Sequence, residues 1–204
     1  MHIRELAVPD SFEITPLQHG DDRGVFLEWF RADELEAVLG RRFNVKQANT
    51  SVSARGSVRG IHFADIPPSQ AKYVTAVRGA VMDFVIDIRV GSPTFGSWDS
   101  VQLDDSARNA VFLAEGLGHC FVALTDGATV SYLVSEPYNP GHEHAITPFD
   151  ADIELDLPID RADLLLSPRD LGAPTLSEAQ QSGLLPVWND AQAFYASRSS
   201  SEAS

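Results

Sequence analysis

The sequence predicts an all-β fold, a sandwich or barrel such as a jelly roll, with a few short helices at its periphery. The clearest observation is residues 81–90, where apolar and polar side chains alternate as in a strand with one buried face. Glycine-containing breaks separate further short apolar runs, at residues 72–78, 111–113, 119–124 and 129–135. Many short strands at such regular spacing are typical of β-sandwiches and barrels.

Two short helices are expected outside the strands. Residues 32–39 place three apolar side chains on one stripe, carry acidic residues in the first turn and are followed by Gly40. Near the C-terminus, Thr175 and Glu178 have the spacing of a helix-capping box. Neither segment is long enough to form a core of its own, so both are predicted at the edge of the β-structure.

The composition indicates a single globular domain that does not bind polyanions. Hydrophobic residues make up 44% of the 204 residues, enough for one sizeable core. We place this domain over residues 1–187 and expect residues 188–204 to form a partly disordered tail. The formal net charge of -14 argues against nucleic acids and anionic membranes as partners. Since Cys120 is the only cysteine and no apolar run is long enough for a membrane span, we expect a cytoplasmic protein.

Two expected strands carry side chains capable of acid–base chemistry. Arg59 and His62 are close in sequence, but an ideal strand would point them to opposite faces unless Gly60 introduces a bulge. Taken alone, a surface arginine and a core histidine are the commoner explanation. Tyr132 shares a face with apolar neighbours and is expected inside the barrel, either as a core tyrosine or as a phenol that transfers a proton.

Two further segments are ambiguous in isolation. Lys72 begins a strand after Pro67 and Pro68, where a lysine is usually solvated but can neutralise an oxyanion or a phosphate at a barrel mouth. Residues 166–170, with the sequence Leu-Ser-Pro-Arg-Asp, have the composition of a turn.

Together these segments resemble the dTDP-4-dehydrorhamnose 3,5-epimerases and their relatives in the deoxysugar pathways of antibiotic biosynthesis. Departures from the common family pattern at residues 63–64, 67–68 and 157–158 resemble the antibiotic branch more than the cell-wall rhamnose branch. The resemblance extends from about Phe12 to Asp170, with motifs at residues 22–28, 47–49, 58–62, 71–74, 78–83, 87–96, 118–121 and 166–170, and at Tyr132 and Tyr138.

The resemblance implies a cupin-type jelly roll, a homodimer, a dTDP-linked 4-keto-6-deoxy sugar as substrate, and no metal or other cofactor. It implies that His62 is the base, oriented by Asp170, and that Tyr132 carries a proton on the opposite face of the sugar. Lys72 would lie near the ketone oxygen. The other implied substrate contacts are Arg23, Arg59, His119 and Arg169 to the pyrophosphate and sugar, Glu28, Gln47, Asn49 and Glu143 to the nucleoside, Tyr138 stacked on thymine, and Phe26.

The chemistry of such a substrate fits these roles. A ketone at C4 acidifies the hydrogens on C3 and C5, and inversion needs a proton-carrying group on each face of the ring. A histidine backed by a carboxylate suits proton removal, and a cation near the ketone oxygen stabilises the enolate. No hydride transfer is required, which agrees with the lack of a glycine-rich dinucleotide motif. The exact sugar, and whether C3, C5 or both are inverted, stay open.

Two other functions are compatible with parts of the sequence. A metal-dependent cupin enzyme could use His142 and His144, whose spacing suits two metal ligands, or His119. However, His62 is followed by no second histidine, so the first cupin metal motif is incomplete. A non-catalytic module that binds nucleotide sugars would use the same basic residues, but it would not need His62, Tyr132 and Asp170 together.

Overall fold

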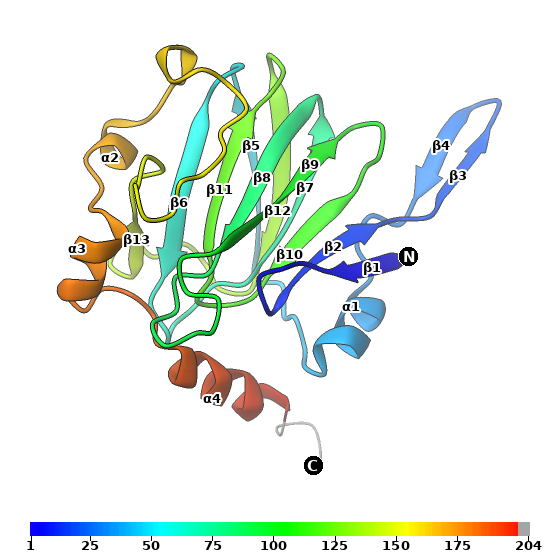
Figure 1. Cartoon of the computed structure of the whole chain (residues 1–204). Helices are drawn as coiled ribbons and strands as arrows, with labels where there is room; N and C mark the ends of the chain where they lie inside the picture. The colour runs from blue at the N-terminus through cyan, green and yellow to red at the C-terminus, as the bar shows by residue number, and fades with distance from the viewer. Residues whose placement is uncertain (200–204) are drawn as a thin grey trace.

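Two antiparallel β-sheets lie face to face and form the body of the molecule (Figure 1). The computed structural model describes residues 1–199. The six-stranded sheet has the order β1 (His2–Glu5), β2 (Ser11–Thr15), β10 (Ala110–Leu113), β7 (Lys72–Arg78), β12 (Ala128–Val134) and β5 (Gln47–Ser53). The five-stranded sheet has the order β13 (Glu143–Ala145), β6 (Val58–Ala64), β11 (Gly118–Ala123), β8 (Ala80–Ile86) and β9 (Trp98–Asp104). The predicted all-β jelly roll is therefore confirmed.

The alternation predicted for residues 81–90 divides the core into two layers. Val81 and Val85 on β8 contribute to the cluster between the two sheets, which also contains Val74 and Val130 of the opposite sheet. Phe84 and Ile86 point the other way, into a second cluster covered by the segments after β13. Each fully buried aliphatic or aromatic side chain stabilises the fold by roughly 1.5–3 kcal/mol.

Strand β8 ends earlier than the alternation predicts, at Ile86 instead of residue 90. The polar residues Asp87 and Arg89 are fully buried, because they pair with each other in a turn. The Asp87 carboxylate also accepts hydrogen bonds from the hydroxyls of Ser92 and Thr94. Polar residues in an alternating strand pattern are expected to face solvent. Asp87 and Arg89 instead close a buried loop.

The helices lie at the periphery, as predicted (Figure 1). The first, α1 (Ala32–Leu39), ends at Gly40 in the left-handed conformation, with φ 64°. The capping box of Thr175 and Glu178 is present at the start of α3. The bounds of the remaining helical segments are η1 (Arg161–Asp163), α2 (Pro168–Leu171), α3 (Leu176–Gln181) and α4 (Trp188–Ser199).

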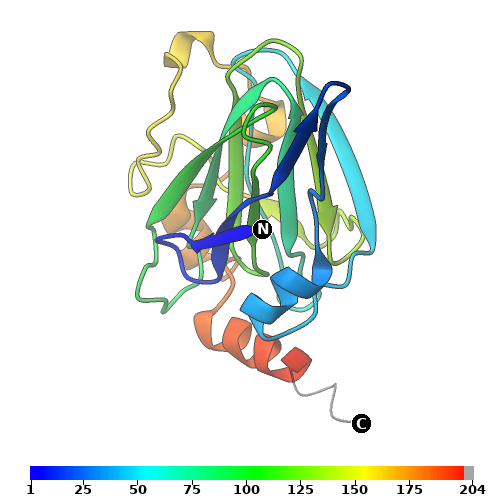
Figure 2. The ribbon, with the colours of Figure 1, turned by 90° about the vertical axis from the view of Figure 1, so that its right-hand side faces the viewer.

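Helix α4 corrects the prediction that residues 188–204 form a tail. Ala191 and Tyr195, four positions apart on one face, are buried against the body of the protein. The Tyr195 hydroxyl donates a hydrogen bond to the carbonyl of Glu115, and the Arg41 guanidinium lies 4.3 Å from the centre of the Tyr195 ring. Figures 1 and 2 place α4 below the sandwich at the same end as α1. Residues 200–204 lie outside the described part of the chain.

A separate two-stranded hairpin, β3 (Gln18–Asp21) and β4 (Gly24–Leu27), projects from the sandwich on the side away from β13 (Figure 1). Its tip is exposed, including the apolar side chains of Val25 and Phe26, the latter 68% exposed. Across residues 1–199, the helices are all too short or too polar to cross a membrane.

Candidate active site

A bulge at Gly60 brings Arg59 and His62 to the same face of β6. His62 lies opposite His119 on β11, whereas Arg59 lies opposite Phe121, so three residue steps on one strand match two on the other. Gly60 has φ +139°, and a Cβ there would lie 2.5 Å from the carbonyl oxygen of His119. The sequence left open whether such a bulge exists, and the structure shows that it does. Because Phe121 belongs to the cluster between the sheets, this face of β6 is directed into the barrel.

His62 is held by a buried carboxylate from α2. Its Nε2 lies 2.7 Å from Oδ1 of Asp170, which is 3% exposed. The residues that looked like a turn form this single-turn helix, in which Ser167 caps the backbone N–H of Asp170. Burial opposes ionisation of Asp170, but the hydrogen bond and electrostatic attraction of His62, with smaller contributions from Ser167 and Arg169, together outweigh it and hold the pKa of the carboxyl below its usual range. A neutral His62 that donates from Nε2 keeps its lone pair on Nδ1.

A second histidine–carboxylate pair lies next to the first. His119 Nε2 is 2.8 Å from Oδ2 of Asp83, and both residues are buried. Asp83 was not among the predicted site residues, although the pattern of β8 contained a signal. It is a carboxylate in the middle of a strand whose neighbours are almost all apolar, and it is on the same face as Val81 and Val85, which point between the sheets.

The facing sheet presents Lys72, Tyr132, Asn49 and Gln47 on one side. Tyr132 pairs directly with Asn49, and Val134, two residues further on, pairs with both Lys72 and Gln47. Since strand neighbours in register share a face, these four side chains point the same way. Gln47 donates to Asn49 with a distance of 2.7 Å, which orients both amides.

The side chains of Lys72 and Tyr132 are partly buried, and neither has a hydrogen-bonding partner in the protein within residues 1–199. Desolvation lowers the pKa of the Lys72 ammonium, and the carboxylates of Glu143 and Asp83 act in the opposite direction. Burial, followed by the nearby Glu143 carboxylate, raises the pKa of the Tyr132 phenol, while Arg59 lowers it. These mutual influences show that side chains from both sheets converge on one region, where Tyr132 is a protonated phenol at neutral pH.

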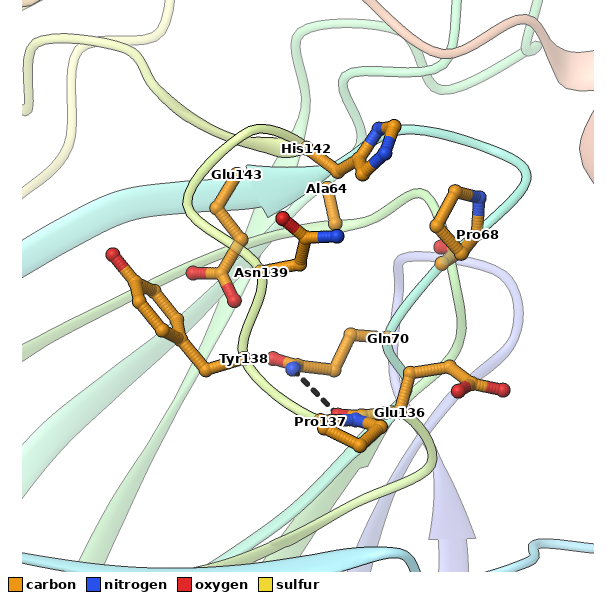
Figure 3. A pocket seen from close by; sticks show the side chains of 10 residues that line it. Ala64, Pro68, Gln70, Glu136, Pro137, Tyr138, Asn139, His142 and Glu143 are labelled. Carbon is orange, nitrogen blue, oxygen red and sulfur yellow. Dashed lines mark hydrogen bonds between the residues drawn. The ribbon is translucent and has the colours of Figure 1, made fainter.

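A cavity of about 280 Å³ lies at the edge of this region, between the segment after β6 and the segment before β13 (Figure 3). Tyr138 and Glu143 are among its lining residues, and Figure 3 shows the Glu143 carboxylate directed toward the Tyr138 side of the cavity. The Gln47 side chain accepts a hydrogen bond from the backbone of Tyr138, which connects the cavity to β5. Arg169, next to Asp170, donates to the backbone carbonyl of Glu143.

Three predicted substrate contacts are not brought to this region within the single chain. Arg23 and Phe26 are on the projecting hairpin, where Arg23 forms an exposed ion pair with Asp21. Glu28 follows that hairpin and pairs with Arg31 at the start of α1. Arg59 does lie in the region, and its guanidinium donates to the Ser53 hydroxyl on β5.

The histidines that suggested a metal-dependent cupin have another partner. His142 Nδ1 and His144 Nε2 lie 2.9 and 2.7 Å from the two carboxylate oxygens of Asp65. Within residues 1–199, no three histidine, cysteine or acidic side chains are arranged to hold a metal ion. That the protein needs no metal stays a prediction.

As a whole, the arrangement can remove and supply protons on two sides of a bound ring. One face offers an imidazole with a buried carboxylate behind it, and the other offers a protonated phenol. The ammonium of Lys72, on the strand next to Tyr132, and the His119–Asp83 pair, next to His62, can bind a partially charged oxygen. Such a set suits the formation and reprotonation of an enolate.

Comparison of the sequence and the structure with known proteins also points to sugar epimerases. The sequence model of the dTDP-4-dehydrorhamnose 3,5-epimerase family matches residues 5–178. The chain is 55% identical over 195 residues to the dTDP-4-dehydrorhamnose 3,5-epimerase of Mycolicibacterium smegmatis, covering 95% of each. It is 52% identical to the dTDP-4-dehydrorhamnose 3-epimerase of Streptomyces niveus, covering 95% of this chain and 92% of the relative. The crystal structure of a 4-keto-6-deoxy sugar epimerase from the novobiocin gene cluster of Streptomyces spheroides aligns with a TM-score of 0.92 at 52% identity, covering 94% of this chain and 96% of the other.

Proposed function

Because the chain belongs to the dTDP-4-dehydrorhamnose 3,5-epimerase family, we propose that His62 and Tyr132 carry the protons in the reaction of this isomerase. The substrate is a dTDP-linked 4-keto-6-deoxyhexose, and the reaction inverts C3, C5 or both. The observation that carries the proposed roles is the His62–Asp170 pair, which faces the barrel interior opposite Tyr132.

Proton removal is assigned to His62. Nδ1 takes a proton from C3 or C5, the electron pair of the broken C–H bond forms a double bond to C4, and the π electrons of the C4 carbonyl move to its oxygen to give the enolate. The imidazolium that forms is stabilised by Asp170, which is ionised and in hydrogen-bonding contact with Nε2. The enzyme thus gains a base whose tautomer and orientation are fixed before the substrate arrives.

Stabilisation of the negative charge that develops on the ketone oxygen is assigned to Lys72. Its ammonium has no protein hydrogen-bonding partner within residues 1–199 and is partly removed from water, where a cation stabilises an enolate most strongly. The neighbouring His119–Asp83 pair would bind the sugar or the first phosphate. Both groups are present before the reaction, so little reorganisation accompanies the chemical step.

Delivery of the new proton is assigned to Tyr132. Its phenol stays protonated at neutral pH because burial disfavours the phenolate. The enolate collapses to the ketone as its carbon takes the phenol proton from the face opposite His62. The phenolate then regains a proton from water, and the imidazolium loses one to water, so the enzyme is restored.

The nucleotide end is assigned to the cavity edge, with Tyr138 stacked on thymine and Gln47, Asn49 and Glu143 around the nucleoside. Arg59 and Arg169 would hold the pyrophosphate. Support for this assignment comes from the register of β5 and β12, which aligns Asn49 and Gln47 with Tyr132 and so continues the site from the sugar to the cavity.

We further propose that the protein acts as a homodimer and that the projecting hairpin completes the site of a second copy. Arg23 and Phe26 are exposed, and their hairpin projects away from β6 in its own chain (Figure 1), although the resemblance assigns both residues to the substrate. An exposed Phe26 beside Val25 is an apolar surface that a partner would cover. The cytoplasmic location also remains a prediction, supported by the single cysteine.

The roles of the two proton carriers are tested by following solvent deuterium into the sugar for two variants. His62→Ala should abolish exchange at C3 and C5, because no base remains. Tyr132→Phe should retain exchange, because His62 still removes a proton, but its rate of inversion should fall about 100-fold or more. Full inversion by Tyr132→Phe at the normal rate would contradict the assignment of Tyr132, and exchange by His62→Ala would contradict that of His62.

A further inference from the structure

One carboxylate at the edge of the active site binds two imidazoles. Asp65 directly follows β6, and its two oxygens lie 2.9 Å from His142 Nδ1 and 2.7 Å from His144 Nε2. The backbone N–H of Asp65 also donates to the carbonyl of His142, with a distance of 3.0 Å. Burial disfavours the charged form of Asp65, but the hydrogen bonds from both histidines outweigh it and lower the pKa of the carboxyl. The carboxylate is therefore ionised at neutral pH and bound on both oxygens.

The two histidines differ in their surroundings. The His144 ring lies 5.4 Å from the ring of Phe63, which is buried in the core. His142 instead lines the cavity and is more exposed, and its backbone N–H donates to the carbonyl of Asn139. Asp65 thus connects a histidine anchored on the core to a histidine in the cavity wall.

This connection holds the segment that carries Tyr138 and Glu143. Strand β13 has only three residues, and Glu143 pairs with Ala64, the residue before Asp65. So short a strand gives little independent order. Gln70 makes a second connection across the cavity by donating to the carbonyl of Glu136, the hydrogen bond drawn in Figure 3. Asp65 itself does not line the cavity, so any effect on a ligand must pass through the histidines.

We propose that Asp65 is a positioning residue for the nucleotide end of the substrate. Through His142 and His144 it fixes the segment between β12 and β13 in the conformation in which Tyr138 and Glu143 contact the nucleoside. This role rests on the proposed assignment of the nucleoside to the cavity edge. It also gives the His142 and His144 pair, which resembles a metal motif in the sequence, a function in binding the nucleotide.

The role separates binding from chemistry, which makes it testable. In Asp65→Ala both imidazoles lose their shared acceptor, so the segment is less ordered before the nucleotide binds. We expect KM for the dTDP-sugar and Kd for dTDP to rise about tenfold, while kcat stays within about twofold of the wild type. The Kd for inorganic pyrophosphate, which lacks the nucleoside, should not change.

Two further variants control for general effects on folding. Asp65→Asn should recover most of the dTDP affinity, because an amide accepts from one imidazole and donates to the other in its alternative tautomer. Asp105→Ala removes a carboxylate that accepts a backbone hydrogen bond from Gly79, at the end of β7 remote from Lys72. It makes the same change in charge and should leave KM, kcat and the Kd values for dTDP and pyrophosphate unchanged.

Three results would overturn the proposal. These are an unchanged Kd for dTDP in Asp65→Ala, an equal loss of pyrophosphate binding, or a fall in kcat without a rise in KM. Tyr138→Ala, measured in parallel, shows which idea has failed. If it weakens dTDP binding and Asp65→Ala does not, only the positioning role is wrong. If neither variant weakens dTDP binding, the assignment of the nucleoside to the cavity edge is wrong as well.

Discussion

The substitution Asp170→Asn examines the pair on which the proposed mechanism depends. The Asp170 carboxylate is almost fully buried and lies 2.7 Å from His62 Nε2. Asparagine has nearly the same shape, and its amide oxygen can still accept the imidazole N–H, so the geometry is kept while the negative charge is lost. The substitution therefore isolates the electrostatic contribution of the carboxylate.

The size of the effect follows from the charge that forms on His62. Two unit charges about 4 Å apart interact by ~4 kcal/mol at an effective dielectric of about 20. The imidazolium is only partly formed in the transition state, so about 2.7–4 kcal/mol is lost, or roughly 100- to 1000-fold in kcat. KM should change little, because the substrate does not contact Asp170.

The assay compares kcat for inversion with the rate at which solvent deuterium enters the substrate. Both rates should fall by the same factor, because both pass through proton removal by His62. Asp160→Asn is the matched control, since Asp160 is an exposed carboxylate at the start of η1 whose side chain makes no hydrogen bond or ion pair within residues 1–199. A loss of less than about threefold in Asp170→Asn would refute the argument that the carboxylate stabilises the imidazolium.

Two further predictions concern stability and assembly. Burial disfavours ionised Asp87, but hydrogen bonds from Arg89, Ser92 and Thr94 hold its pKa below the usual range, so its contribution to stability is present above the unfolded-state pKa and lost as pH falls through the folded one. When measured with urea, the free energy of unfolding should therefore decrease as the pH is lowered below about 4. The decrease should be shallower in Asp87→Asn. An identical dependence on acid pH in that variant would contradict the argument. For assembly, sedimentation should give twice the 22.2 kDa chain mass. A mixture of Phe26→Ala and His62→Ala chains should be more active than either variant alone. Each mixed dimer contains one intact site, with His62 from one chain and Phe26 from the other. A monomer with full activity would contradict the homodimer.

The sequence predicted the parts of the fold that rest on local pattern. The jelly roll followed from short alternating strands, α1 from its apolar stripe, and the start of α3 from its capping box. Helix α4 was missed because its C-terminal serines resemble a tail, whereas Tyr195 and Ala191 are ordered by contacts with residues far away in the chain. The end of β8 was misplaced because the pairing of Asp87 with Arg89 is invisible to a burial pattern.

The site was predicted mainly through the family resemblance, and the structure adds what spacing cannot provide. The bulge at Gly60 depends on the neighbouring strand, so the sequence could only name it as a possibility. Asp83 and Asp65 were not predicted as part of the site, because their partners His119 and His142 meet them only after the sheets have formed. Conversely, Arg23 and Phe26 match the family motif, yet a single chain does not bring them to the site.

The central claim is that this fold inverts ring carbons next to a ketone by removing and replacing protons. It is tested most directly by nuclear magnetic resonance of dTDP-4-keto-6-deoxyglucose incubated with the protein in D₂O. The account predicts deuterium at C3, C5 or both, with inverted configuration at the labelled carbon, and the labelled position will show which carbons react. A sugar whose C3 and C5 hydrogens remain unexchanged and uninverted, also when 2-deoxy and 3-amino analogues are offered, would contradict it.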